Sequence, residues 1–144
     1  MNGWLFDTDV LSALAPGRAA LSETPVSWFE ARNEELFFSV ITVMEINAGV
    51  TKLRRVGAAR RSEAMQAWFG DVLGRYGDRV LSFDVASARL AGELSDTATA
   101  IGRHPGFADI AIAAIAKSHD LIVLTANRRH FEPLGVATFN PLSL

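Results

Sequence analysis

Short, almost wholly apolar runs alternate along this chain with longer stretches in which apolar residues recur about every 3.6 positions. The apolar runs occupy residues 4–6, 36–41, 79–83, 121–125 and 136–139. The stretches with helical spacing occupy residues 9–14, 26–32, 42–56, 58–76, 85–101 and 107–119. Because the apolar runs are too short and too apolar to have a solvent-exposed face, they predict strands covered by helices on both sides. The pattern therefore predicts an α/β fold with a central parallel sheet of about five strands flanked by helices.

Length and composition favour one globular domain spanning residues 1–144. The chain has 144 residues, of which 49% are hydrophobic and 21% are charged, as is usual for a folded single domain. It contains no cysteine, which excludes disulfides, thiolate zinc sites and cysteine nucleophiles. No apolar run reaches the length of a membrane span, and the N-terminus lacks a signal-peptide pattern. We therefore expect a cytoplasmic protein with no membrane partner.

The basic residues are unevenly distributed, although the formal net charge is −2. Arginine accounts for 12 of the 14 basic residues. Five basic residues fall within ten positions, and they are Lys52, Arg54, Arg55, Arg60 and Arg61. Such a cluster can hold phosphates even on an acidic protein, but a solvated helix face is the simpler interpretation.

Polar residues stand where several of the predicted strands end. Asp7 directly follows the first strand, and Glu45 begins the helix after the second. Asp109 opens the helix before the fourth strand, which itself ends at Thr125 and Asn127. Because ligands of parallel α/β sheets bind at the carboxyl ends of the strands, we expect these side chains to lie close together.

Most of the acidic residues also have a purely structural explanation. Asp9 and Asp109 stand where a carboxylate favours the start of a helix, and Thr42 and Glu45 have the spacing of a capping box. Asp7 is not explained in this way, because a carboxylate directly after an apolar strand needs donors or a cation. If Asp7, Glu45 and Asp109 converge, their repulsion favours a hard divalent cation, Mg²⁺ or Mn²⁺, among them.

Three segments in order resemble the motifs of the PIN-domain ribonucleases, in particular the VapC/FitB-like toxins of bacterial toxin–antitoxin pairs. The segments are LFDTDVLSAL at 5–14, SVITVMEINAGV at 39–50 and ADIAIAAIAKSHDLIVLTANRRHF at 108–131. The resemblance covers nearly the whole chain. It implies a PIN-like domain with a parallel sheet, an acidic Mg²⁺ site and endonucleolytic hydrolysis of RNA that leaves 5′-phosphate and 3′-hydroxyl ends.

The resemblance also implies a role for individual residues. By position, Asp7, Glu45 and Asp109 match the acidic metal-site residues, with Asn127 at the rim. The hydroxyls that hold the carboxylates in place match Thr8 and Thr125. Two positions depart from the family pattern, because Asp9 replaces the usual asparagine and His130 stands where aspartate is common. The candidate RNA contacts are Arg128, Arg129, Arg54 and Arg55, with His130 as a surface or RNA-contacting residue.

The partners that the resemblance implies are an RNA substrate and a small antitoxin protein that covers the acidic pocket, often with a basic side chain. It further implies a homodimer, and contact with promoter DNA only through the antitoxin.

Two other functions were weighed against the nuclease. The run from Asp7 to Val10 also fits the D-x-D-x-[TV] opening of haloacid-dehalogenase-like phosphatases. That fold needs a later lysine and a further acidic pair after a hydroxyl-bearing strand end, which Thr125 could supply. However, no lysine follows Lys117, and after Thr125 only Glu132 remains as an acid. The second alternative is a catalytically silent PIN-fold module that acts with a DNA-binding antitoxin. The presence of all three acidic residues argues against this alternative.

Overall fold

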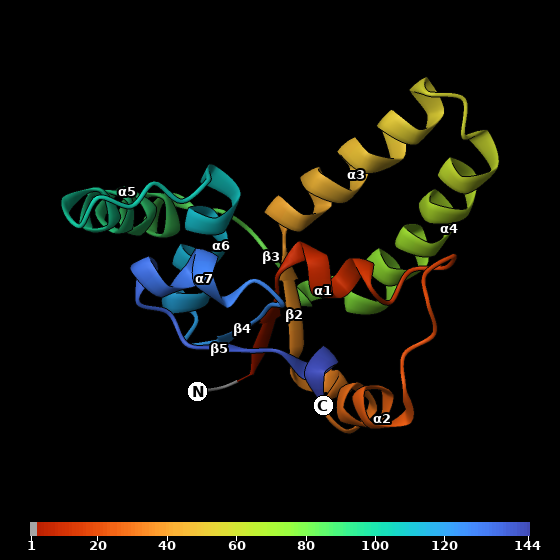
Figure 1. Ribbon diagram of the computed structural model, residues 1–144, viewed down its shortest axis with the longest axis horizontal. Coiled ribbons are helices and arrows are strands. Elements are labelled where there is room, and N and C mark those ends of the chain that lie inside the picture. The colour runs from red at the N-terminus through yellow and green to blue at the C-terminus, as the bar shows by residue number, and fades with distance from the viewer. Residues whose placement is uncertain (1–2) are drawn as a thin grey trace.

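Five parallel strands form a single sheet in the order β3-β2-β1-β4-β5 (Figure 1). The computed structural model describes residues 3–144, so Met1 and Asn2 of the predicted domain lie outside the described residues. The strands are β1 (Trp4–Phe6), β2 (Leu36–Ser39), β3 (Val80–Leu81), β4 (Ile122–Leu124) and β5 (Thr138–Phe139). This architecture confirms the predicted α/β class and the parallel sheet.

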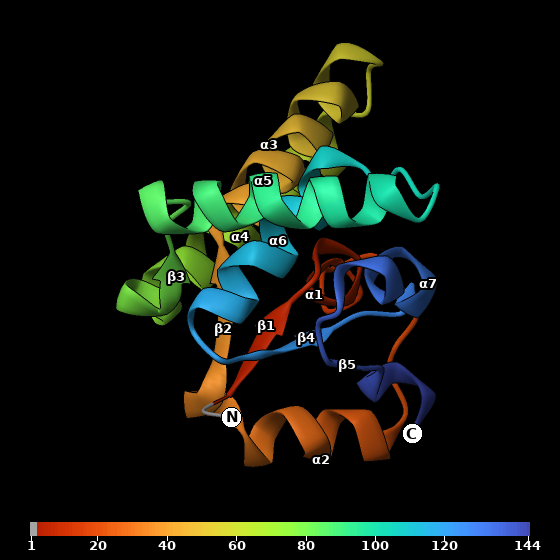
Figure 2. The ribbon, with the colours of Figure 1, turned by 90° about the vertical axis from the view of Figure 1, so that its left-hand side faces the viewer.

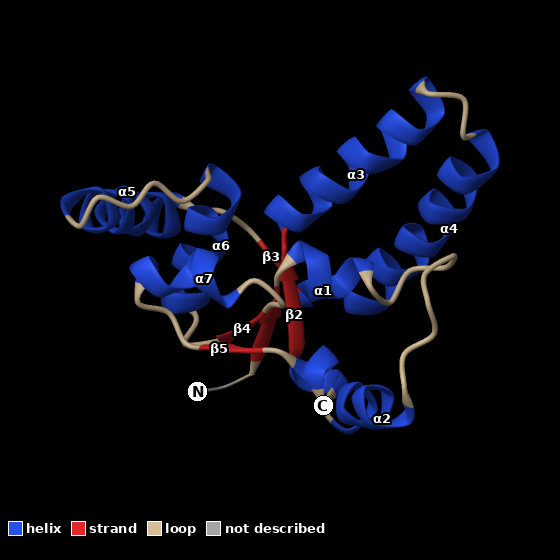
Figure 3. Ribbon diagram, viewed as in Figure 1, coloured by secondary structure: helices blue, strands red, loops and turns tan. Residues whose placement is uncertain are grey.

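Helices cover both faces of the sheet (Figure 3). The α-helices of the described residues are α1 (Thr8–Ser12), α2 (Glu23–Ala31), α3 (Val40–Arg55), α4 (Ala59–Tyr76), α5 (Val85–Ala100), α6 (Phe107–Ser118) and α7 (Arg128–Phe131). Short 3₁₀ turns occur at Asn33–Glu35, Gly77–Arg79, Glu132–Leu134 and Pro141–Ser143. Within residues 3–144, no helix has the length and apolarity that crossing a bilayer would require.

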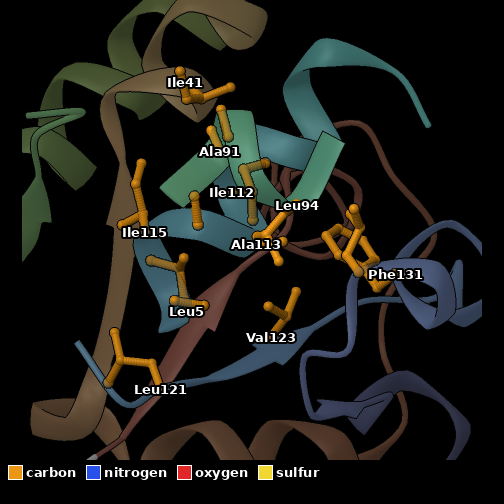
Figure 4. Close-up of a cluster of buried hydrophobic side chains, with 14 of the residues drawn as sticks. Leu5, Ile41, Ala91, Leu94, Ile112, Ala113, Ile115, Leu121, Val123 and Phe131 are labelled. Atoms are coloured by element: carbon orange, nitrogen blue, oxygen red, sulfur yellow. The ribbon is translucent and has the colours of Figure 1, made fainter. Parts of the chain in front are cut away.

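The strands are apolar throughout because each face of the sheet is buried in its own core. Successive side chains of a strand point to opposite faces, so Leu5 packs in the core under α5 and α6, while Phe6 packs in the core that α1 to α4 cover. Figure 4 shows the first of these cores, which Val123 of β4 also enters. The next residue of that strand, Leu124, enters the second core.

The helix α6 is buried on nearly all sides between the sheet and α5. Its six residues from Ala111 to Ala116 have no accessible surface, and four of them are alanine. Alanine has good helix propensity and a small side chain, which lets α5 pack close to α6. This packing places the first turn of α6, which contains Asp109, at the carboxyl edge of the sheet.

Several element boundaries differ from the sequence prediction by one to three residues, and the junction of β2 and α3 bears on the site. The strand β2 ends at Ser39, and α3 begins at Val40, so Val40 and Ile41 are helical rather than extended. Ile41 packs in the core under α5 and α6, and this tertiary contact outweighs the β propensity of its branched side chain. The predicted capping box at Thr42 and Glu45 is therefore wrong, because the residue that precedes α3 is Ser39.

The helices α3 and α4 form an antiparallel hairpin that projects from the sheet (Figures 1 and 2). Gly57, which has a φ of +88° that favours glycine, ends the turn after α3. The buried hydroxyl of Ser62 donates to the carbonyl of Val50 at 2.9 Å and ties the two helices together. The predicted basic cluster lies at the tip of this hairpin, exposed to solvent.

Candidate active site

The carboxylate of Asp7 is buried and held by hydrogen bonds on both oxygens. Asp7 caps α1, so its Oδ1 accepts from the backbone N–H of Thr8 at 2.9 Å. Its Oδ2 accepts from the hydroxyl of Thr125, which ends the neighbouring strand β4, at 2.8 Å. Only 7% of Asp7 is exposed. Burial and the nearby charge of Asp9 raise the pKa of Asp7 to about 7, against the lowering effect of the Thr125 hydroxyl.

Thr8 connects Asp7 to Glu45. Its hydroxyl donates to Oε1 of Glu45 at 2.6 Å, and it lies 3.0 Å from the hydroxyl of Thr42. A hydroxyl has one proton to donate. Because Thr8 gives its proton to Glu45, we assign Thr42 as the donor in the contact between the two threonines. The first turns of α1 and α3 are thus locked together through the side chain that fixes Glu45.

Asp109 lies in the first turn of α6 and is less buried than Asp7, with 22% of its side chain exposed. Burial raises its pKa, and the charges of Glu45 and Asp9 raise it further. His130 of α7, whose Nδ1 lies 3.3 Å from Oδ2 of Asp109, opposes this effect. His130 is therefore placed at the edge of the acidic site, against Asp109.

Asp9 has a larger part in the site than its sequence position suggested. Its Oδ2 accepts from Nδ2 of Asn127 at 2.8 Å and from the backbone N–H of Ala126 at 3.3 Å. Its Oδ1 is buried and has no hydrogen-bond partner among the described residues. Asn127 is itself fixed, because its backbone N–H donates to the Thr125 hydroxyl at 2.9 Å. The sequence feature that could have indicated this role of Asp9 is its spacing from Asp7, because residues that are two positions apart at the end of a strand can face the same pocket.

The structure brings the acidic residues into one electrostatic group without closing them into a ligand cluster. The charge of Asp9 raises the pKa of both Asp7 and Asp109, and that of Glu45 raises the pKa of Asp109. Across residues 3–144, however, no three acidic or histidine side chains are gathered closely enough to form a ready-made metal site. Asp7, Glu45 and Asp109 therefore belong to one group of interacting charges, as predicted, but the three side chains do not form one metal-coordinating position.

The chemistry of this group still fits a hard divalent cation. All its acidic donors are oxygens, which Mg²⁺ and Mn²⁺ prefer. The carboxylates repel one another, and Oδ1 of Asp9 is buried without a donor other than a protonated Asp7. A cation among these carboxylates would offset the repulsion.

The candidate RNA-binding arginines divide into two places. Arg128 and Arg129 lie on α7 beside the acidic group, where Nε of Arg128 lies 3.3 Å from Oε1 of Glu132. Arg54 and Arg55 lie at the far end of α3, nine and ten residues beyond Glu45, which is about 14 Å along the helix axis. Arg54 and Arg55 are therefore separated from the carboxylates, whereas Lys52 and Arg61 of the same cluster line a groove that also includes Glu45.

The sequence that forms this sheet and its acidic edge matches a known family of domains. The model of the PIN domain matches residues 4–135, which is nearly the whole chain. This chain belongs to the PIN-domain family. The match also excludes the haloacid-dehalogenase-like alternative.

Within the family, the sequence is similar to bacterial toxins along almost its full length. It is 34% identical over 141 residues to the VapC ribonuclease Y4jK of Sinorhizobium fredii, covering 95% of this chain and 96% of that protein. It is 32% identical over 138 residues to the toxin FitB of Neisseria gonorrhoeae, with the same two coverages. The crystal structure of FitAcB from N. gonorrhoeae matches with a TM-score of 0.85 and 31% identity, over 98% of this chain and 99% of that one.

Proposed function

We propose that this protein is a divalent-metal-dependent endoribonuclease and the toxin of a toxin–antitoxin pair. The observation that carries the proposal is the group of mutually interacting carboxylates at the carboxyl edge of the sheet, with Asp7 buried and fixed by Thr8 and Thr125. A buried carboxylate beside other carboxylates destabilises the fold, so such a group is expected where it serves a function. The relatives named as a ribonuclease and a toxin support the same reading.

In the proposed site, some residues would bind the metal ion and others would hold those ligands in position. Asp7, Glu45 and Asp109 would hold Mg²⁺, or Mn²⁺ in its place, with Asn127 at the rim. Such an ion lowers the pKa of water and offsets the charge that develops on a phosphodiester during hydrolysis. Thr8 and Thr125 keep Glu45 and Asp7 in position, and Asp9 orients the side chain of Asn127.

The pKa of Asp7 sets how this site responds to pH. At a pKa of about 7, Asp7 is partly protonated in the neutral range, and a proton competes with a cation for the same oxygens. We therefore expect metal affinity and RNA cleavage to rise with pH through the neutral range.

An antitoxin would cover this acidic edge of the sheet. A groove of about 310 Å³ beside Glu45 separates α1 from the α3–α4 hairpin, and its walls include Ile46, Val50 and Leu53. The apolar walls suit the apolar face of a peptide. Glu45 would accept a basic side chain of that peptide, and Arg18, Lys52 and Arg61 elsewhere in the lining would accept acidic ones. The solved structure of FitAB bound to an IR36 DNA fragment, which is 31% identical to this chain, supports an antitoxin partner and a complex that binds DNA. We propose that this chain contacts promoter DNA only through the antitoxin. A homodimer and a cytoplasmic location remain part of the proposal.

The test is cleavage of total cellular RNA by the purified, antitoxin-free protein. We expect cleavage with Mg²⁺ or Mn²⁺, none with EDTA, and a loss of at least about 100-fold in Asp7→Asn. Asp71→Asn is the matched control, because it makes the same change on the exposed surface of α4. Circular dichroism establishes that both variants fold.

The alternative of a silent binding module gives the opposite result. In that case, neither metal ion promotes cleavage by the wild-type protein, while the complex with the antitoxin still binds promoter DNA. Equal cleavage by Asp7→Asn and Asp71→Asn would remove the carboxylate group from the mechanism.

A further inference from the structure

A second polar hollow adjoins the acidic group on its outer side. It has a volume of about 270 Å³ and lies between the loop that joins α5 to α6 and the helix α7. Asp109 and Gly106 form its inner end, while its remaining polar lining is basic or imidazole: Arg103, His104, Arg129 and His130. One carboxylate thus belongs both to the proposed catalytic group and to this hollow.

The backbone fixes the side of the hollow that carries Arg103. The helix α5 ends in a Schellman motif, in which the N–H of Arg103 donates to the carbonyl of Ala98 at 2.9 Å and that of Gly102 to Thr99 at 2.9 Å. Gly102 takes a φ of +73°, which the motif requires. Arg103 therefore leaves the helix at a defined position, although its side chain is exposed.

The guanidinium of Arg103 reaches across to the opposite wall. Its Nη2 lies 3.4 Å from the backbone carbonyl of Arg129, a long contact that occupies one of five N–H groups. His104 offers at least one further donor in either protonation state. The wall of the hollow thus has several donors, held from two elements that are 26 positions apart.

The charge of the hollow favours an anion. Arg103 and Arg129 carry two permanent positive charges against the single carboxylate of Asp109, even when both histidines are neutral. Arginine presents a planar fork of donors that matches phosphate oxygens. An adjoining hollow of about 420 Å³ shares Arg129 and His130 with the first and extends past Asn127, so donors continue along α7.

We infer that this hollow, formed by Arg103, His104, Arg129 and His130, is a subsite for an RNA phosphate next to the phosphate that is cleaved. The inference rests on the proposed function for the identity of the ligand as RNA. An RNA strand carries a phosphate at every nucleotide. When the phosphate to be cleaved lies at the carboxylates, including Asp109, a neighbouring phosphate would lie in the hollow that shares Asp109. The subsite holds the strand in register over the carboxylates and contributes to RNA binding more than to the chemical step.

The test compares Arg103→Gln with Arg89→Gln, which removes the same charge from an exposed position near the other end of α5. The probe is a fluorescently labelled, mixed-sequence, single-stranded RNA, and its affinity is measured by anisotropy in EDTA over a range of salt concentrations. We expect Arg103→Gln to bind about tenfold more weakly, and its salt slope to be smaller by about 0.7. Arg103→Lys should bind with intermediate affinity, because it keeps the charge but not the fork. Arg89→Gln should match the wild type.

Steady-state cleavage with Mg²⁺ separates the subsite from the catalytic group. Arg103→Gln should raise KM with a smaller change in kcat, since the hollow binds a phosphate that does not react. Equal RNA affinity of the Arg103→Gln and Arg89→Gln variants would overturn the inference while leaving the nuclease intact. So would an effect of Arg103→Gln on antitoxin affinity alone, which would assign the hollow to an acidic protein segment. Conversely, Arg103-dependent RNA binding by a protein that cleaves with neither metal ion would support the subsite and refute the nuclease.

Discussion

The two ends of α3 lie in opposite environments. At its start, Glu45 accepts a hydrogen bond from Thr8, and the turn around it packs against α1 and the sheet. At its end, Arg54 and Arg55 are exposed, and the described contact of Arg54 is a hydrogen bond to Gln66 of α4 at 3.2 Å. The acidic end is therefore fixed by many partners, whereas the basic end depends mainly on the neighbouring helix of the same hairpin.

This difference separates two kinds of contribution to function. Side chains at the fixed end can hold a geometry to within the tolerance that catalysis needs. Side chains at the projecting end can attract a polyanion without a defined geometry, because long-range charge does not require one. Variants at the two ends should therefore differ in the size of their effect and in the property that changes.

The largest expected effect is the dependence of stability on pH that Asp7 produces. Its pKa is about 7 in the folded protein and near 3.9 in an unfolded chain, so the folded state binds more protons between these values. Stability should therefore fall as pH rises from about 4 to about 7, by an upper limit of about 4 kcal/mol. Urea titrations of the metal-free protein across this range measure the slope.

The control for this slope is Asp7→Asn, which cannot ionise. Its stability should fall less than that of the wild type over the same interval, with the remaining slope due to other groups such as Asp109, and Asp71→Asn should keep the wild-type slope. Equal slopes for the wild type and Asp7→Asn would show that the pKa of Asp7 is not raised. Added Mg²⁺ should reduce the slope, because a bound cation favours the ionised form.

The next effect is that of Thr125→Val, which removes the donor to Asp7 while keeping the shape of the side chain. We expect RNA cleavage at neutral pH to fall about 10- to 100-fold, as when an outer partner of a metal ligand is lost. Because the Thr125 hydroxyl lowers the pKa of Asp7, its removal should shift the pH profile of cleavage upward. An unshifted profile with the same loss of activity would mean that Thr125 acts only through packing.

The smallest effect is expected at the projecting end of α3. The double variant Arg54→Gln/Arg55→Gln should weaken RNA binding by no more than about threefold and reduce the salt slope slightly. Its kcat should equal that of the wild type, because these side chains lie about 14 Å along the helix from Glu45. A large fall in kcat would contradict the separation of the two ends.

The sequence was sufficient to predict the parallel sheet and the gathering of acidic side chains at its carboxyl edge. Alternating short apolar runs require strands buried on both faces, and Leu5 and Phe6 are indeed each in a different core. Asp7 was predicted as a strand-end carboxylate because the predicted helix began at Asp9 and left Asp7 without a local role. The structure corrects that part of the argument, since α1 begins at Thr8 and Asp7 is its N-cap. Such inferences depend on periodicity and on chain order, which a single sequence contains.

What the sequence could not predict depends on contacts between distant residues. The start of α3 at Val40 follows from the packing of Ile41 against the α5–α6 side, which overrides local propensity. The role of Asp9 depends on Asn127, which is 118 positions away. Similarly, α7 has only four residues and no periodicity long enough to detect. The hollow at Arg103 exists only because the end of α5 meets α7.

The alanine-rich interior of α6 has a consequence for the evolution of this chain. Asp109 is in the first turn of a helix whose next two turns have no free space around them. A helix moves as a rigid rod, so a larger side chain at Ala113 or Ala114 would displace the carboxylate together with the axis. Catalytic groups tolerate displacements of only about 0.5 Å. Selection on the proposed RNA cleavage would therefore restrict the size of side chains that never touch a substrate. Sequence change at these buried positions should be slower than their chemistry alone would require.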